Sequence, residues 1–353
     1  MKISIREALA RGAALLQAAG IESARLDARI LLSQALGIPS GDLFFAEATP
    51  ARIEIFESLI RRRAAREPLA YITGRKEFWS LEFEVGPGVL IPRPETETLV
   101  EESLRRFPDT DAPLRVLDIG TGSGCLLIAS LKERPNAIGL GIDSSAAALA
   151  YARRNAARHK LDDRYWFELV EAADAQSRQV NTQRRGGAGV EDVEPPRRQD
   201  AEDFLRAFGR HISLAPWRLG GFPSQLRDLA REFDLILANP PYLTDEEFAA
   251  SAPEIINYEP RAAFAAGPDG LEGFRSFLPL VAASLSPGGM AFFEIGTGQV
   301  DKVSKIIMNG GLEVRHAVDD LSGIPRCLAI GRAGEGCQLA PLKNSVGKEP
   351  ATR

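Results

Sequence analysis

The sequence contains few of the residues that build disulfide frameworks or metal centres. It includes three cysteines, Cys125, Cys327 and Cys337, and three histidines scattered along 353 residues. A low, odd number of cysteines excludes a disulfide framework and fits a reducing compartment. Three separated histidines do not supply a zinc ligand set, so we expect no metal site.

Basic residues and long apolar runs are also scarce. The formal net charge is −5 and the isoelectric point is about 5.5, so the overall charge does not favour binding to nucleic-acid phosphates. No stretch approaches the ~20 apolar residues of a membrane span, and the N-terminus lacks the apolar run of a signal peptide. We therefore expect a soluble cytoplasmic protein that contacts neither membranes nor nucleic acid directly.

Helix signals dominate residues 1–70. Ser4 and Glu7 form a capping-box pattern, and Thr49 followed by Pro50 is a typical N-cap and first helical position. Apolar residues follow each signal at helical spacing. We predict a small N-terminal helical domain over this range.

The apolar pattern changes period after residue 70. Over 71–93, alternating apolar and polar residues predict a hairpin connector. Over 94–332, strand and helix signals alternate, which predicts an α/β domain with a doubly wound, mostly parallel sheet. The strand candidates are RVLDI (115–119), AIGLGID (137–143), FDLILA (233–238), MAFFEI (290–295), RCLAIG (326–331) and either YWFELV (165–170) or HISL (211–214).

Two segments contain almost no large apolar residues. Residues 172–203 are rich in Gln, Arg, Gly, Pro and acidic residues, and residues 333–353 have a similar polar character. Such segments cannot bury enough apolar surface to offset the entropy lost on ordering. We predict a disordered insertion at 172–203 and a disordered tail at 333–353.

A glycine-rich turn links a predicted strand to a predicted helix in VLDIGTGSGCLLIA (116–129). Gly120, Gly122 and Gly124 permit tight turning and close approach of a ligand, and the following helix N-terminus favours a polar or anionic group. Asp143 ends the strand AIGLGID, where a carboxylate can accept hydrogen bonds from both hydroxyls of a ribose. The combination predicts a nucleoside site rather than an ordinary turn.

The tetrapeptide NPPY directly follows the apolar strand FDLILA. Both prolines lack an N–H, so the backbone presents carbonyl acceptors. The Asn239 side-chain oxygen and the Pro240 carbonyl can therefore accept both N–H bonds of a planar NH₂ group, and Tyr242 adds an aromatic face. The motif predicts a site for an amide or an exocyclic amine.

These motifs resemble those of known methyltransferases. GTGSG with Asp143 is similar to the S-adenosyl-L-methionine site of class I methyltransferases, and NPPY is similar to the motif of amino-group methyltransferases. EFWSLEFEVGPGVLIPRPETE (77–97) and DGLEGFR (269–275) resemble the release-factor glutamine methyltransferase family (HemK/PrmC). The resemblance implies a Rossmann-like class I methyltransferase domain behind a substrate-recognition helical domain. It also implies methylation of the glutamine in the Gly-Gly-Gln motif of peptide-chain release factors.

The resemblance also assigns roles to individual residues. Trp217 matches a position close to the adenine in the family, but Ala215 and Pro216 precede it where the family has Gly-Asp, so Asp174 is a second candidate. The residues assigned to the cofactor are Gly120, Thr121, Gly122, Ser123, Gly124, Asp143, Trp217 and Asn239. Those assigned to the glutamine are Asn239, Pro240, Pro241 and Tyr242, with Asn239, Pro240 and Tyr242 as the catalytic set.

Residues of the hairpin side have two interpretations. Phe78, Arg93 and Glu97 either shape the wall of the site on that side or have a purely structural role.

Two other functions are compatible with the motifs. A nucleic-acid N-methyltransferase acting on an adenine amino group can use NPPY, but it needs base flipping and a positive surface. The basic cluster Arg61, Arg62, Arg63 and Arg66 is the candidate for that surface, or else a solvated helix face. A binding module without catalysis is the third possibility, supported by the altered step before Trp217. We expect a monomeric enzyme with a protein substrate.

Overall fold

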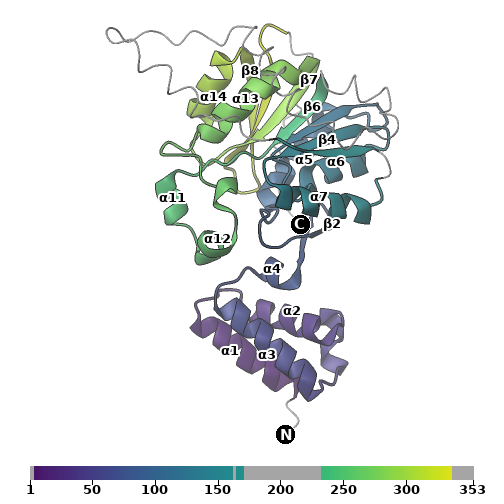
Figure 1. The fold of residues 1–353 in the computed structure, drawn as a ribbon, viewed down its shortest axis with the longest axis vertical. Coiled ribbons are helices and arrows are strands. Elements are labelled where there is room, and N and C mark those ends of the chain that lie inside the picture. Colours follow the sequence, from purple (N-terminus) through teal and green to yellow (C-terminus); the bar gives the residue numbers. More distant parts are fainter. Residues whose placement is uncertain (1–3, 162–163, 171–231, 336–353) are drawn as a thin grey trace, which may run out of the picture.

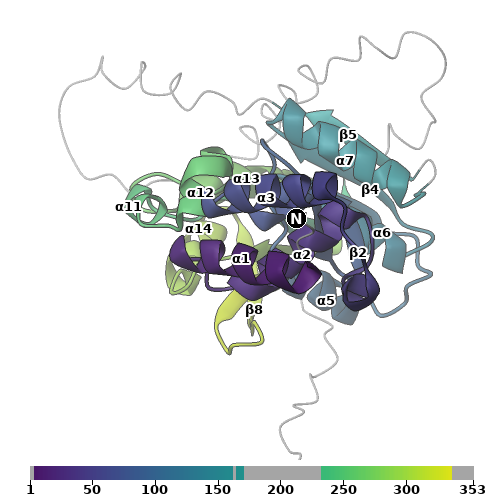
Figure 2. The ribbon, with the colours of Figure 1, turned by 90° about the horizontal axis from the view of Figure 1, so that it is seen from below.

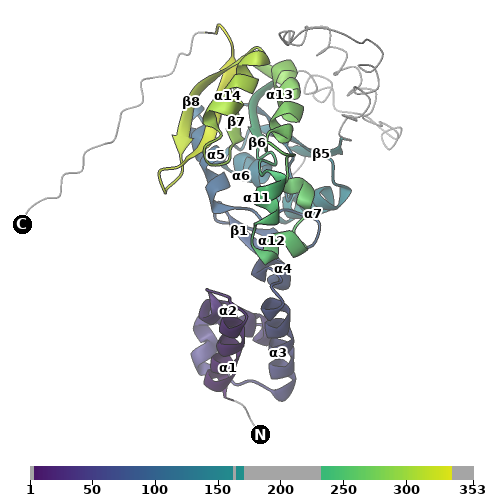
Figure 3. The same cartoon turned by 90° about the vertical axis from the view of Figure 1, so that its left-hand side faces the viewer.

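The computed structural model describes residues 4–161, 164–170 and 232–335. Two bodies follow one another along the long axis of the molecule, a small helical body at the N-terminal end and a larger α/β body (Figure 1). The short helix α4 (Leu69–Thr73) lies between them (Figure 3). The proposed insertion at 172–203 and residues 336–353 of the proposed tail lie outside the described residues.

The N-terminal body is a helical bundle whose helices begin at the predicted caps. The Ser4 side chain accepts a hydrogen bond from the Glu7 N–H, and Thr49 does the same for Arg52 in a helix whose first residue is proline. Seen from the N-terminal end, the three long helices lie beside one another (Figure 2). The elements are α1 (Ile5–Ala18), α2 (Ala24–Leu36), a 3₁₀ helix η1 (Ser40–Phe45) and α3 (Pro50–Ala64).

A hairpin forms within the predicted range 71–93, but it is shorter than predicted, because residues 71–73 belong to helix α4. Strands β1 (Arg75–Phe78) and β2 (Leu81–Glu84) pair in antiparallel register, with Phe78 opposite Leu81. The two turn residues, Trp79 and Ser80, have φ of 52° and 56°, as a two-residue hairpin turn of the primed type requires.

The predicted doubly wound sheet is also confirmed, as a seven-stranded sheet in the order β5-β4-β3-β6-β7-β9-β8. The first five strands are parallel neighbours, whereas β9 pairs antiparallel with both β7 and β8. The bounds are β3 (Arg115–Ile119), β4 (Ile138–Asp143), β5 (Tyr165–Leu169), β6 (Phe233–Ala238), β7 (Leu285–Glu294), β8 (Leu312–Asp319) and β9 (Pro325–Arg332).

Two details of the sheet go beyond the sequence prediction. Tyr165–Leu169 forms a strand, which agrees with YWFELV, one of the two proposed alternatives. The other alternative, HISL (211–214), lies outside the described residues. Strand β8 was not predicted. It is an edge strand whose residues are mostly half-buried or exposed, so it has no continuous apolar run.

Helices cover both faces of the sheet, as Figure 1 shows. Neighbouring residues of one strand enter different cores: Val116 packs in the core beneath α5, α6 and α7, while Leu117 packs in the core beneath α13 and α14. This alternation explains why the parallel strands are apolar throughout. The helices are η2 (Pro94–Thr96), α5 (Glu97–Arg106), α6 (Cys125–Glu133), α7 (Ala146–Arg158), α11 (Asp245–Ala249), α12 (Pro253–Tyr258), η4 (Arg261–Ala263), α13 (Glu272–Ser284) and α14 (Val300–Asn309).

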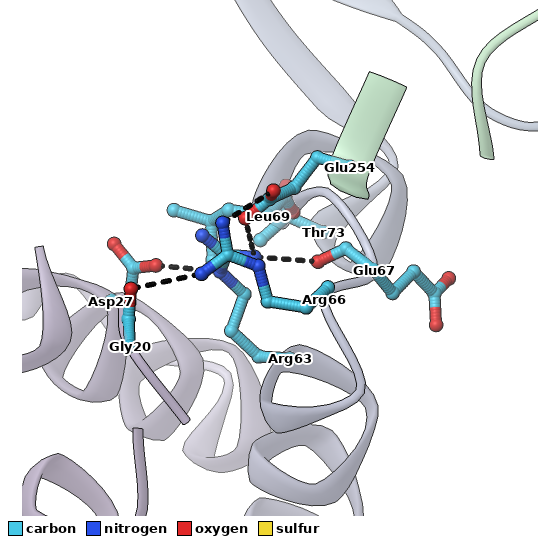
Figure 4. Close-up of polar contacts among 8 residues, drawn as sticks. All are labelled: Gly20, Asp27, Arg63, Arg66, Glu67, Leu69, Thr73 and Glu254. Carbon is cyan, nitrogen blue, oxygen red and sulfur yellow. Dashed lines mark hydrogen bonds and ion pairs between the residues drawn. The ribbon is translucent and has the colours of Figure 1, made fainter. Parts of the chain in front are cut away.

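An ion-pair cluster joins the two bodies (Figure 4). The Arg63 guanidinium of α3 lies 2.7 Å from the Asp27 carboxylate of α2 and 2.9 Å from the Glu254 carboxylate of α12. Arg66 lies 2.7 Å from the other Glu254 oxygen, and Tyr258 donates a hydrogen bond to the Ala65 carbonyl. The helical body is therefore connected to a segment that follows NPPY in the chain.

None of the helices in the described ranges is long and apolar enough to cross a membrane.

Candidate active site

The strand register aligns four strand ends at one edge of the sheet. Ile119 of β3 pairs with Ile142 of β4 and with Ala238 of β6, and Ala238 also pairs with Phe293 of β7. The next residue of each strand or loop therefore belongs to one row at the carboxyl edge. In the order of the strands, this row is Asp143, Gly120, Asn239 and Glu294.

The glycine-rich turn has the backbone geometry that its sequence predicts. Gly120, Gly122 and Gly124 have φ of 72°, 57° and 82°, which side-chain-bearing residues rarely adopt. A Cβ at Gly124 would lie 3.0 Å from the Ile128 side chain and 3.2 Å from that of Ala152, whereas one at Gly122 would meet no atom closer than 3.9 Å. At Gly124 the turn therefore packs closely against α6 and α7, whereas at Gly122 there is free space beside the backbone.

Two hydroxyl residues of the turn are buried. The Thr121 hydroxyl donates a hydrogen bond to the Asp118 carboxylate at 2.6 Å, and Ser123 is 2% exposed. The Thr121 hydroxyl is therefore used by Asp118, while the Ser123 hydroxyl oxygen is buried with no hydrogen-bond partner among the described residues.

Asp118 is a functional candidate that the sequence analysis missed. Its Oδ2 accepts hydrogen bonds from Thr121 and from the Leu127 N–H, while Oδ1 is buried with no hydrogen-bond partner among the described residues. Burial raises the pKa of this carboxyl to about 7. The signal for it was present, because Asp118 is a charged residue flanked on both sides by apolar residues of β3, Leu117 and Ile119.

The Asp143 carboxylate is hydrogen-bonded to the glycine-rich turn and to the loop that follows β4. One carboxylate oxygen accepts a hydrogen bond from the Gly122 N–H and the other from the Ser145 N–H, both at 2.8 Å. Burial raises the pKa of Asp143, and these backbone bonds oppose that shift. Each oxygen keeps a further lone pair, so the half-buried carboxylate can still accept hydrogen bonds from a ligand.

The NPPY segment lies beside the turn. The Asn239 amide Nδ2 donates a hydrogen bond to Thr96 Oγ1 at 3.1 Å, which leaves Oδ1 as the acceptor of that side chain. Within the described ranges, no donor is bonded to the Pro240 carbonyl. Asn239 and Tyr242 line a pocket together with Arg93, Phe264 and Glu294.

Glu294 is a second candidate that the sequence analysis missed. It is 1% exposed, accepts a hydrogen bond from the Thr96 hydroxyl at 2.5 Å and another from the Tyr242 hydroxyl at 3.2 Å. Burial raises the pKa of Glu294 to about 7. A polar residue at the end of the apolar run MAFFE is the same signal that identified Asp143 and Asn239.

The DGLEGFR segment contacts the NPPY backbone closely. A Cβ at Gly270 would lie 2.6 Å from the Tyr242 carbonyl oxygen, and one at Gly273 would lie 2.4 Å from the Pro241 carbonyl oxygen. Both glycines are therefore required for this approach, which gives a physical reason for the motif.

Of the three residues considered on the hairpin side, one lines the pocket and two make structural contacts elsewhere. Arg93 lines the pocket, lies 5.7 Å from the Phe264 ring centre and donates a hydrogen bond to Glu259. Glu97 instead accepts a hydrogen bond from the Trp79 N–H at 2.8 Å, and Phe78 is buried in the core. The proposed adenine contacts, Trp217 and Asp174, lie outside the described residues.

Three of the four arginines of the basic cluster, in and just after α3, form ion pairs within the chain. Arg62 pairs with Glu67, and Arg63 and Arg66 both pair with Glu254. These three guanidinium groups are therefore paired with carboxylates of the same chain, whereas Arg61, the fourth member of the cluster, is exposed.

Comparisons with known proteins extend these observations. Residues 7–74 match the family described as the PrmC N-terminal domain, and residues 110–184 match a methyltransferase domain. A release factor glutamine methyltransferase of Rhodospirillum rubrum is 35% identical over 95% of this chain and 86% of its own length. That of Geobacter sulfurreducens is 36% identical over 89% and 92%.

A solved structure also resembles this chain. It is a protein-(glutamine-N5) methyltransferase (release factor-specific) from Alicyclobacillus acidocaldarius, 24% identical, which aligns over 71% of this chain and 99% of its own with a TM-score of 0.34.

The doubly wound sheet, the glycine-rich turn with Asp143 and the matching methyltransferase domain define a class I S-adenosyl-L-methionine-dependent methyltransferase. The described residues fit this cofactor, because Gly122 leaves space beside the turn, Asp143 offers acceptors to a ribose, and Asp118 has an unpaired buried oxygen. The relatives define the group more narrowly. The chain belongs to the release factor glutamine methyltransferase family.

Proposed function

We propose that the enzyme transfers a methyl group from S-adenosyl-L-methionine to the side-chain amide nitrogen of the glutamine in the Gly-Gly-Gln motif of peptide-chain release factors. The observation that carries this proposal is the acceptor pair next to the cofactor turn. Asn239 Oδ1 and the Pro240 carbonyl follow β6 directly, one strand away from Gly120. Relatives named as release factor glutamine methyltransferases support the choice of substrate.

The acceptor pair suits the chemistry of an amide. The lone pair of an amide nitrogen is delocalised into its carbonyl, so the nitrogen is a poor nucleophile and has to be oriented. Two acceptors that bind both N–H bonds fix the plane of the NH₂ group and the direction of attack. Positive charge grows on the nitrogen as the new bond forms, so Asn239 Oδ1 and the Pro240 carbonyl bind the transition state more strongly than the ground state.

When bound, S-adenosyl-L-methionine supplies an electrophilic methyl group on a sulfonium. We propose that the backbone from Gly120 to Gly124 holds its methionine portion and that Asp143 accepts hydrogen bonds from its ribose. The unpaired oxygen of Asp118 suits a cationic ligand group beside the turn. Trp217 and Asp174 remain the two candidates for the adenine contact.

The pocket wall favours a protein substrate in our proposal. Arg93 and Phe264 stand beside Asn239 and Tyr242, and α12 links this part of the chain to the helical domain. We propose that the enzyme works as a cytoplasmic monomer and that the helical domain takes part in substrate recognition.

The test is methyl transfer from labelled cofactor to a release factor with an intact Gly-Gly-Gln motif. We expect one methyl group on the glutamine, located by mass spectrometry, and none on a Gln→Glu version of the substrate. Labelling of the Glu version would contradict the amide assignment. Labelling of DNA or RNA in place of the release factor would favour the adenine alternative.

A further inference from the structure

Glu294 occupies a position that the proposed reaction does not use directly. It ends β7 in the row that contains Asn239, and it touches the NPPY segment through two different residues. Because its side chain is 1% exposed, both carboxylate oxygens must find partners within the protein.

When Glu294 is ionised, the hydrogen bond between Thr96 and Glu294 can run in one direction only. An ionised carboxylate can only accept hydrogen bonds, so the Thr96 hydroxyl gives its single proton to Glu294 Oε2. Thr96 Oγ1 is then available only as an acceptor, and the group that it accepts from is Asn239 Nδ2 at 3.1 Å. The amide of Asn239 is therefore turned so that Oδ1, not the NH₂ group, is left for the substrate.

The contact through Tyr242 fixes the other end of the motif. The Tyr242 hydroxyl donates to Glu294 Oε1, and the Tyr242 carbonyl accepts a hydrogen bond from Gln299 Nε2 at 2.9 Å. Gln299 is itself held, because its Oε1 accepts a hydrogen bond from the Gly296 N–H at 2.9 Å. Glu294 and Gln299 thus restrain the ring and the backbone of one residue.

We infer that Glu294 is a positioning residue for methyl transfer. Its ionised carboxylate acts through Thr96 to present Asn239 as an acceptor, and through Tyr242 to hold the wall of the same pocket. This inference rests on the proposed function, because a substrate NH₂ group needs an acceptor at Asn239.

Protonation of Glu294 would reverse the chain of hydrogen bonds. A protonated carboxyl can donate to Thr96, and Thr96 can then donate to Asn239 Oδ1, which turns the Asn239 NH₂ group toward the substrate NH₂ group. Two donors then face each other and the amide is no longer bound. The groups that influence the charge of Glu294 are Thr96, Arg326 of β9, Tyr242 of the pocket and Glu95 of η2. Cys327 of β9 faces Glu294 in the sheet, and Arg93 lines the same pocket.

The pH dependence follows from this reversal. Burial raises the pKa of Glu294 to about 7, whereas the Thr96 and Tyr242 hydrogen bonds and the charge of Arg326 lower it. The active form is the ionised one, so kcat rises as the pH rises through about 7. The wild-type enzyme is expected to show this rise of kcat with pH (the pH limb), and a variant without the carboxylate is expected to lack it.

The experiment compares Glu294→Gln, Thr96→Val and Thr96→Ser with the wild type in methyl transfer to a full-length release factor. Glu294→Gln keeps the shape but introduces a donor, and Thr96→Val removes the hydroxyl that relays the direction. We expect kcat to fall roughly 10- to 100-fold in both, since each removes a charge-assisted link to Asn239. Thr96→Ser keeps the hydroxyl and should retain most of the activity. Cofactor affinity, measured by calorimetry, should not change.

A matched control separates positioning from loss of stability. Glu102→Gln changes another buried glutamate, 5% exposed, which pairs with Arg105 and His316 away from the pocket. It should lower the melting temperature without removing the pH limb of kcat. Full activity in Glu294→Gln, or an unchanged pH limb, would overturn the inference. If the wild type itself does not methylate the release factor, the proposed function fails instead.

Discussion

The ion-pair cluster between the two domains allows a quantitative prediction. Asp27 is 2% exposed and holds Arg63 within the helical domain, whereas Glu254 bridges from the catalytic domain to both Arg63 and Arg66. We predict that Asp27→Ala destabilises the protein much more than Glu254→Gln does.

The difference follows from what each change leaves behind. Without Asp27, the Arg63 guanidinium keeps Glu254, whose side chain is 18% exposed, but loses the carboxylate that is buried with it, and breaking such a buried pair costs about 3–5 kcal/mol. Without the Glu254 carboxylate, Arg63 keeps Asp27, and Arg66 keeps its hydrogen bond to the Gly20 carbonyl. The cost is then closer to the ~1–3 kcal/mol of a charged group losing a hydrogen-bond partner.

The assay is urea unfolding followed by circular dichroism, with Glu246→Gln as the control. Glu246 is an exposed glutamate of the neighbouring helix α11, and a surface change of this kind stays within about 0.5 kcal/mol of the wild type. An equal loss of stability in the Asp27 and Glu254 variants would refute the reasoning, because it would mean that Arg63 depends on both carboxylates alike.

The same pair has a pH dependence whose sign can be worked out. Burial acts to raise the pKa of Glu254, but the hydrogen bonds from Arg63 and Arg66 outweigh it, so the pKa lies below 4.5. A lowered carboxylate pKa contributes stability above the unfolded value, which is lost as the pH falls through the folded value. The stability gap between wild type and Glu254→Gln should therefore shrink as the pH is lowered below 4.5.

Three further predictions concern the site. Asp143→Ala should weaken S-adenosyl-L-methionine binding, because each lost bond to a charged acceptor is worth roughly 1.5–3 kcal/mol; unchanged affinity by calorimetry in a folded variant would reject the ribose assignment. Asn239→Ala should lose about 2.7–4 kcal/mol of transition-state stabilisation, measured as kcat/KM for the release factor; full activity would contradict the amide site. Gly273→Ala should cost about 1–3 kcal/mol of stability and lower kcat, because its Cβ would lie 2.4 Å from the Pro241 carbonyl oxygen; normal kcat would show that the NPPY backbone can shift without consequence.

Local signals account for the parts of the site that the sequence predicts. Gly120, Asp143 and Asn239 each follow an apolar strand and belong to a short motif, so their place at the carboxyl edge follows from the α/β pattern alone. The capped helices and the hairpin are predictable for the same reason, because caps and turns depend on neighbouring residues.

Contacts between distant residues were not predictable in this way. Thr96 and Glu294 are 198 positions apart, and Arg63 and Glu254 are 191 positions apart. Nothing in either local sequence shows that the two partners meet, because the meeting depends on the register of β7 and on the placement of α12. Strand β8 was missed for another reason, since an edge strand needs no continuous apolar run.

The segment that follows NPPY contacts both the helical domain and the wall of the pocket. Glu254 of this segment pairs with α3 of the helical domain, while Glu259 accepts hydrogen bonds from the Ile91 N–H and from Arg93, which lines the pocket. In our proposal, binding of a release factor to the helical domain and orientation of the glutamine amide in the pocket therefore depend on the same stretch of chain.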